Sequence, residues 1–225
     1  MTADQLLDHS FALVGQLGLP LAIAAWLTVF GGALAMGVVL RGVNTTGVWT
    51  AAILVGVTGL AAHLLDFFVT LRITPDLSME ANPLWRVVID RFGLPVARAY
   101  GLSGKVLLSV LSVQLFAWHL SHRASLFPQR ASGPLDFVQQ LGRGAPHFGN
   151  IRSFFAFAFA LFGPYFFYIT FMNVTGAREF DLYERLPSPP VAILGYFALV
   201  TAAYFTTMWR AFRRATGAAV RSSTS

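Results

Sequence analysis

Five long apolar stretches, separated by polar segments, dominate the pattern of this chain. They cover residues 19–40, 46–71, 95–120, 154–174 and 190–209. Each stretch has about the 20 residues that an α-helix needs to cross a lipid bilayer. The pattern therefore predicts an all-α fold, a polytopic bundle of five membrane-spanning helices that forms a single membrane domain over residues 1–225.

Glycine and proline within this pattern predict two local features of the bundle. Asn82 followed by Pro83 is typical of a helix start, because Asn caps free backbone N–H groups and Pro suits the first turn. The short helix that it opens ends at Gly93, and we expect it to lie at the outer membrane interface. Gly163-Pro164 predicts a kink within the fourth stretch, since Pro lacks a backbone N–H.

The composition agrees with a membrane protein and excludes several other classes. Hydrophobic residues make up 56 % of the chain and charged residues 12 %, whereas a soluble domain has roughly 25 % charged residues. The chain has no Cys, so disulfides, thiolate metal sites, Fe–S clusters and a catalytic Cys are excluded. The net charge of +6 would suggest nucleic acid in a soluble protein. Here we interpret it as a signal of membrane topology and expect no nucleic acid.

The charges divide unevenly between the two predicted sides of the membrane. One side holds six Arg and eight acidic residues. The other side holds Asp136 as its one acid, with the basic residues Arg41, Arg123, Arg130, Arg143, Arg152, Arg210, Arg213, Arg214 and Arg221. Because Lys and Arg favour cytoplasmic segments, we expect the N-terminus outside and a basic tail, residues 210–225, in the cytoplasm. The Arg- and Ala-rich composition indicates the cytoplasmic (inner) membrane of a prokaryote.

Polar residues line one face of each of two predicted spans. In the stretch 46–71, helical spacing aligns Gly56, Gly59, His63, Asp66 and Thr70. In the stretch 95–120, the same spacing aligns Gly101, Lys105, Ser109, Ser112, Phe116 and His119. Small residues allow helices to approach closely, and polar residues in hydrocarbon need partners. We therefore expect these two faces to meet.

Asp66 and Lys105 are expected to form an ion pair in the outer leaflet. Asp66 lies six residues before Arg72, and Lys105, the one lysine of the chain, lies seven residues after Arg98. At about 1.5 Å per helical residue, both lie roughly 10 Å inside the predicted outer boundary. Pairing removes most of the cost of burying each charge. The pair could fix helix register, or it could belong to a site for a ligand, an ion or catalysis.

The outer loop adds two candidates to this region, Glu80 and Asn82. Both precede the short helix and could lie over the ion pair. The predicted site then comprises His63, Asp66, Thr70, Glu80, Asn82, Lys105 and Ser109. Its oxygen and nitrogen atoms suit a divalent cation, with Asp66, Glu80 and His63 as candidate ligands. The same groups could instead act as acid and base on a bound lipid.

A short motif in this region resembles that of a family of small prokaryotic membrane proteins of unknown function. It reads Asp66-x-x-x-Thr70, then Glu80-x-Asn82-Pro83, and it continues with the Gly-terminated short helix and Lys105. The resemblance covers about residues 60–110. Since the family has no known activity, the resemblance implies only that these positions are the ones to test.

Known catalytic motifs offer no further guide to function. We find no P-loop, dinucleotide fingerprint, HExxH or GxSxG pattern, and a haem between His63 and His119 is not expected because they differ in depth. The sequence favours a protein that binds a lipid-like or small ligand, or an auxiliary subunit of a membrane assembly. The alternatives are an intramembrane enzyme on a lipid substrate and a small oligomeric transporter. Expected partners are membrane lipids, other membrane subunits or further copies of the chain.

Overall fold

The computed structural model describes residues 3–78, 82–144, 147–177, 186–187 and 189–222. Every regular element in these ranges is a helix, which confirms the all-α prediction. Five helical segments are long and apolar enough to cross a membrane. They are Gly18–Gly42, Thr46–Ile73, Leu84–Leu126, Gly149–Val174 and Val191–Thr216. These segments overlap all five of the predicted stretches.

The first two spans differ in their regularity. Helix α1 (Ala3–Val39) is interrupted at Gly18, whose φ of 53° and ψ of −139° belong to the region that glycine tolerates best. A 3-10 turn, η1 (Leu40–Gly42), follows α1. Helix α2 (Thr46–Ile73) then crosses the bundle without a break. The polar face predicted for this span therefore runs along one continuous helix.

Helix α3 (Pro83–His122) contains both the predicted short helix and the third span. The Asn82 side chain accepts a hydrogen bond from the Leu84 backbone N–H at 3.0 Å, so the predicted N-cap is confirmed. Gly93 has a φ of 78° and a ψ of 172°, and it separates the short helix from the long one. Glycine suits this position because other residues rarely adopt a positive φ.

The fourth span is broken where the sequence predicts a kink. A turn at Leu161 and Phe162 separates α5 (His147–Ala160) from α6 (Gly163–Ala177). Before α5, the 3-10 turn η2 (Arg123–Leu126) and α4 (Pro134–Gly144) complete the connection from α3. The break allows α5 and α6 to contact different neighbours.

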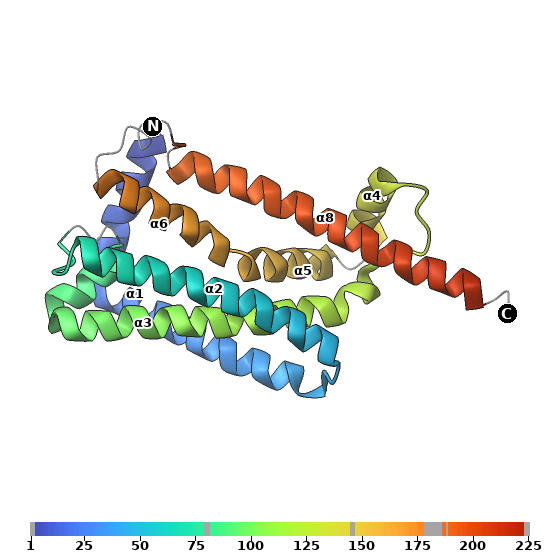
Figure 1. The fold of residues 1–225 in the computed structure, drawn as a ribbon, viewed down its shortest axis with the longest axis horizontal. Helices are drawn as coiled ribbons and strands as arrows, with labels where there is room; N and C mark the ends of the chain where they lie inside the picture. The colour runs from blue at the N-terminus through green and yellow to red at the C-terminus, as the bar shows by residue number, and fades with distance from the viewer. Residues whose placement is uncertain (1–2, 79–81, 145–146, 178–185, 188, 223–225) are drawn as a thin grey trace.

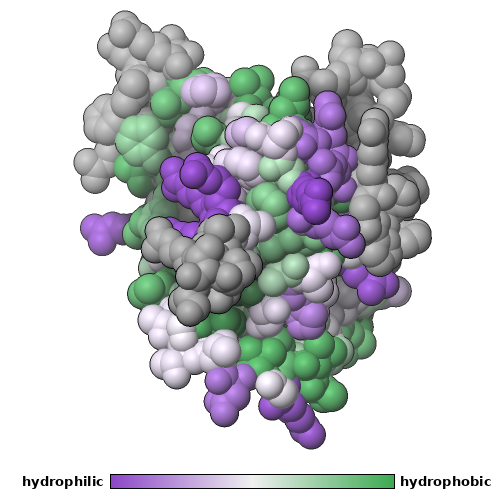
Figure 2. Space-filling model, turned by 90° about the vertical axis from the view of Figure 1, so that its right-hand side faces the viewer, coloured by the Kyte–Doolittle hydropathy of each residue, from purple (hydrophilic) through white to green (hydrophobic). Residues whose placement is uncertain are grey.

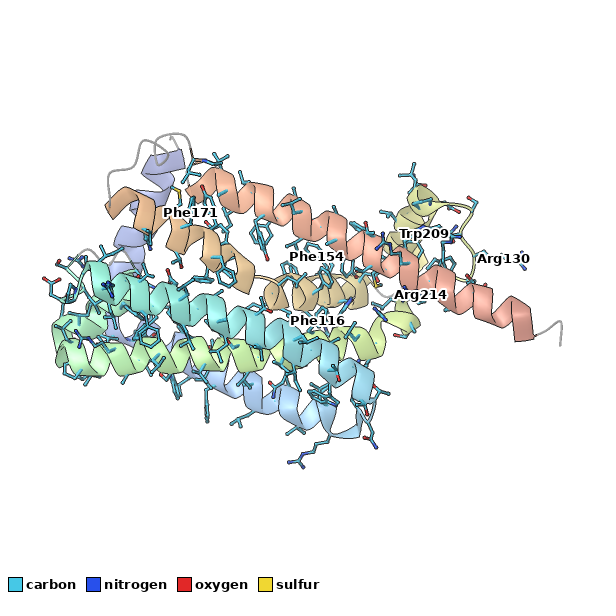
Figure 3. The ribbon with its side chains drawn as sticks, viewed as in Figure 1. Phe116, Arg130, Phe154, Phe171, Trp209 and Arg214 are labelled. Atoms are coloured by element: carbon cyan, nitrogen blue, oxygen red, sulfur yellow. The ribbon has the colours of Figure 1, made fainter. Side chains whose placement is uncertain are left out.

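The last helix, α8 (Pro189–Ser222), extends well beyond the predicted end of the fifth span at residue 209. An aromatic cluster explains the extension, since Phe212 of α8 is only 5 % exposed. The buried members of this cluster come from α4, α5 and α8, and they are Phe137, Leu141, Phe157, Ala158, Val200, Tyr204, Met208 and Phe212. Phe116 of α3 and Phe154 of α5 pack against it (Figure 3).

Helices α2 and α3 form the centre of the bundle (Figure 1). Helix α2 packs against both α3 and α6, whereas α8 packs mainly against α5. Helix α1 packs along α3, and two hydrogen bonds connect the two helices. Trp26 Nε1 donates to Ser103 Oγ at 3.0 Å, and the Tyr100 hydroxyl donates to the Ala22 carbonyl at 3.0 Å.

The charges that divide along the sequence also divide in space. The ends of α1, α3 and α8 lie at one end of the bundle, and the end of α2 lies at the other (Figure 1). We call the first the basic end, because it carries Arg41, Arg123, Arg210, Arg213 and Arg214. Figure 2 looks onto this end and shows hydrophilic side chains gathered there.

Glycines bring α2 close to both of its neighbours. A Cβ added at Gly56 would lie 2.1 Å from Cγ2 of Val113 on α3. A Cβ added at Gly163 would lie 2.4 Å from the Cα of Gly59, where α6 meets α2. Small residues at such crossings let helix backbones touch in a membrane. These contacts place α3 and α6 against the polar face of α2.

Gly163→Ala is expected to lower the free energy of unfolding by about 1–3 kcal/mol, as overpacking does in other tightly packed sites. The added methyl meets the backbone of α2, which has no side chain to rotate away. Thermal unfolding in detergent measures the loss. Gly104→Ala is the control, since no atom beyond the adjacent residues and the backbone of its own helix lies within 4 Å of its added Cβ. Equal stability of the two variants would contradict the close contact of α2 and α6.

Candidate functional site

An ion pair joins the polar faces of α2 and α3, as the sequence predicts. Lys105 Nζ donates a hydrogen bond to Asp66 Oδ2 at 2.8 Å. Each side chain is 13 % exposed, so the pair is largely shielded. Among the side chains that the structure describes, this is the ion pair found between two of them. The two helices therefore meet with these charges at matching depth.

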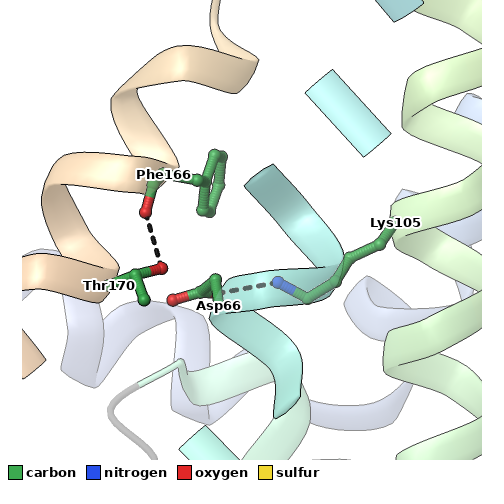
Figure 4. Close-up of polar contacts among 4 residues, drawn as sticks. All are labelled: Asp66, Lys105, Phe166 and Thr170. Carbon is green, nitrogen blue, oxygen red and sulfur yellow. Dashed lines mark hydrogen bonds and ion pairs between the residues drawn. The ribbon is translucent and has the colours of Figure 1, made fainter. Parts of the chain in front are cut away.

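Helix α6 supplies a third wall that the two polar faces did not predict. The centroid of the Phe166 ring lies 5.2 Å from Lys105 Nζ, within the range of a cation–π contact. Thr170, one turn further on, is buried and donates its hydroxyl to the Phe166 carbonyl at 2.8 Å. Figure 4 shows both residues beside the ion pair. We call His63, Asp66, Lys105, Phe166 and Thr170 the Asp66–Lys105 site.

The sequence carries a signal for this third wall. Gly163, Phe166 and Thr170 follow one another at steps of three and four residues. This is the spacing that aligns a glycine with polar residues on α2 and α3. The signal is hard to see because aromatic residues surround the whole of this helix, which hides any single face.

His63 is the most deeply buried ionisable group of the site. Its side chain lies one turn before Asp66, and the residue is 5 % exposed. The centroids of the His63 and Phe166 rings lie 4.3 Å apart. His63 Nδ1 is buried and has no hydrogen-bond partner among the described residues. Leaving such an atom unsatisfied costs about 1–3 kcal/mol, so it marks a place for a ligand or an ordered water.

The structure places the other predicted residues at varying distance from this centre. Ser109 is buried, and its hydroxyl donates to the Lys105 carbonyl at 2.9 Å, which supports the helix turn behind the lysine. Thr70 is partly exposed, one turn beyond the ion pair on α2. Asn82 is exposed and acts as the cap of α3. Glu80 lies outside the described residues.

The short helix at the start of α3 folds back over the long one near the ion pair. A Cβ added at Gly101 would lie 1.7 Å from Trp85 Cζ2, so the indole rests directly on the glycine. The rings of Trp85 and Phe67 then pack edge to face, with centroids 5.8 Å apart. Because Gly101 lies one turn from Lys105, this fold-back gives the site an aromatic cover on one side.

The site combines one carboxylate, one ammonium group and one imidazole. Among the side chains that the structure describes, no three from His, Asp or Glu lie close enough to hold a metal ion. Because Glu80 falls outside those ranges, a metal bound by Asp66, Glu80 and His63 stays a prediction. Toward a ligand, the Lys105 ammonium group can donate a hydrogen bond and the Asp66 carboxylate can accept one. His63 Nδ1, which is unsatisfied among the described residues, can form another.

The other buried histidine belongs to a separate part of the bundle. His119 is 1 % exposed, and its Nδ1 lies 2.8 Å from Ser153 Oγ on α5. Its ring also packs against Phe157 and against Tyr204 of α8. His63 instead faces α6. The two histidines therefore have different neighbours and serve different helix crossings.

Comparisons with protein-family models, with curated proteins and with solved structures gave no match to this chain. The resemblance of residues 60–110 to a family of small prokaryotic membrane proteins therefore depends on the short motif alone.

Lys105→Met is expected to lower the free energy of unfolding by about 3 kcal/mol, because it leaves the Asp66 carboxylate buried without its partner. The double variant Asp66→Asn/Lys105→Met should recover most of that loss, since neither charge remains. Equilibrium unfolding in detergent measures both variants, with Arg41→Met as a control that removes an exposed charge. A double variant less stable than Lys105→Met alone would show that the two charges are not coupled in this way.

Proposed function

We propose that this chain is an integral membrane protein that binds a lipid-like molecule at the Asp66–Lys105 site, in the outer leaflet. The observation that carries the proposal is the buried His63 Nδ1, which has no hydrogen-bond partner among the described residues. It lies one helical turn from an ion pair whose side chains each keep 13 % of their surface exposed. A polar head group that reaches His63 would satisfy this nitrogen.

Apolar side chains beside the site suit the tail of such a ligand. On α2, Leu65 is 45 % exposed and Phe68 59 % exposed. On α6, Phe167 is 40 % exposed, and Phe171, which is labelled in Figure 3, is 45 % exposed. In a bilayer these surfaces would contact acyl chains. A molecule with a polar head and an apolar tail therefore fits this region better than a fully polar one does.

The pairing of Asp66 with Lys105 favours binding over catalysis. A general base needs a carboxylate that is open to the proton it abstracts, and the Asp66 carboxylate is already bonded to the Lys105 ammonium group. The pair instead presents a donor and an acceptor together to a head group. There are two alternatives. An intramembrane enzyme would modify the bound lipid chemically, and an oligomeric transporter would move it across the membrane.

We also propose that the N-terminus faces outwards and the C-terminus the cytoplasm, in the inner membrane of a prokaryote. The proposal is supported by the positive-inside rule. Arg123, Arg210, Arg213 and Arg214 belong to the basic end, whereas Asp76 belongs to the loop at the opposite end. This orientation would place the Asp66–Lys105 site in the outer half of the bilayer.

His63→Phe is expected to reduce the retention of a specific membrane lipid about tenfold, the effect of losing one hydrogen bond to a charged or strongly polar group. The substitution keeps an aromatic ring against Phe166 and leaves the ion pair intact. Native mass spectrometry of protein purified in mild detergent measures which lipids stay bound. The same spectra detect a lipid that has been chemically modified.

Ser112→Ala is the matched control for this measurement. Ser112 is buried in α3, and its hydroxyl donates to the Leu108 carbonyl of its own helix at 2.8 Å. Its loss should leave lipid retention unchanged. Retention that is equal in the wild type and His63→Phe, or lost equally in Ser112→Ala, would count against the proposed site.

Single-cysteine labelling tests the proposed orientation cleanly, because the natural chain has no Cys. A cysteine at Ser78, exposed at the end opposite the basic end, should react with a membrane-impermeant maleimide added to intact cells. A cysteine at Ser132, exposed in the connection before α4, should react only after the membrane is opened. The reverse pattern would invert the topology.

A further inference from the structure

The basic end of the bundle carries a hollow lined by arginines. Arg210, Arg213 and Arg214 of α8 line this hollow, which is shallow and open to the surface and has a volume of about 280 Å³. All three side chains are exposed. Arg130, from the segment before α4, lies at the same end of the molecule as Arg214 (Figure 3). The hollow is distinct from the Asp66–Lys105 site, which involves α2, α3 and α6.

Aromatic residues hold the arginine-bearing part of α8 in place. Phe212, which lies between these arginines in the sequence, is 5 % exposed. Its ring centroid lies 5.2 Å from that of Phe137 on α4 and 5.8 Å from that of Phe127. Trp209 also packs against Phe137, with ring centroids 5.4 Å apart. The backbone that carries the arginines is therefore anchored, which lowers the entropy cost of binding.

The positive charges of this end are not neutralised by a described acid. Arg123 of η2 is partly buried, and its positive charge is repelled by that of Arg214. Asp136 is the one acid of this side, and its carboxylate accepts hydrogen bonds from the Ser132 N–H and hydroxyl, at 2.7 and 2.9 Å, and from Gln140 at 2.7 Å. Those hydrogen bonds lower the pKa of the Asp136 carboxylate. They also hold this carboxylate against Ser132 and Gln140, at the start of α4.

We infer that the hollow binds an anion that carries two phosphate groups. Guanidinium groups bind phosphate oxygens with two parallel hydrogen bonds. Three arginines line the hollow, so two phosphates match their total charge better than one does. The three arginines lie in the last turns of the candidate span Val191–Thr216, where lipid head groups would lie if this span crosses a bilayer. Basic pockets at this level bind anionic lipids in other membrane proteins.

The anion could come from a lipid or from solution, and two measurements separate these sources. The first titrates inorganic pyrophosphate into the full chain, held in nanodiscs of phosphatidylcholine, by isothermal titration calorimetry. The second adds cardiolipin, a lipid with two phosphates, to the nanodiscs and detects protein-bound lipid by native mass spectrometry. Arg214→Gln is compared with Arg41→Gln, which removes an exposed arginine of the same end outside the hollow.

Binding in at least one measurement is expected, weakened about tenfold by Arg214→Gln, since a charge-assisted contact is lost. Arg41→Gln should leave it unchanged. The measurement that shows binding identifies the source of the phosphates. The inference is overturned if neither probe binds, or if Arg41→Gln weakens binding as much as Arg214→Gln does. Thermal unfolding of both variants confirms that they are folded, as expected for exposed side chains.

Discussion

The cost of placing a charge in hydrocarbon is the constraint on which this bundle depends. The ion pair between Asp66 and Lys105, with a hydrogen bond of 2.8 Å, reduces this cost because each charge has a partner of opposite sign. The contact requires α2 and α3 to lie close together and at matched depth, and Gly56 permits that approach by leaving room for Val113. The pair therefore sets the register of the two central helices, and α1 and α6 pack against this centre.

Helix α6 turns a structural pair into a candidate binding site. Gly163 brings α6 onto Gly59 of α2, so the Phe166 ring reaches both the lysine and His63. A register pair alone would need no further polar group. His63 Nδ1 is buried without a hydrogen-bond partner among the described residues, and this is the observation from which we propose a ligand-binding role.

The two ends of the molecule offer different chemistry to the membrane. The Asp66–Lys105 site is nearly shielded and its charges cancel, whereas the basic end presents exposed arginines without a described acidic partner. An aromatic cluster lies between α8 and α5 near the basic end and fixes the last turns of α8. The two proposed binding sites, one for a lipid-like ligand and one for an anion with two phosphate groups, would therefore lie in different parts of the bundle.

The features that depend on local pattern could be predicted from the amino-acid sequence. Apolar length predicted the five spans, helical periodicity predicted that Asp66 and Lys105 meet, and glycine or proline predicted the breaks at Gly93 and Gly163. The tertiary structure was needed to show that Phe166 and Thr170 lie beside the ion pair (Figure 4), that His63 Nδ1 has no hydrogen-bond partner among the described residues, and that three arginines of α8 line a hollow. These depend on which helix faces touch across long sequence separations. Local hydrophobicity is nearly uniform around membrane helices, so it leaves those neighbours undetermined.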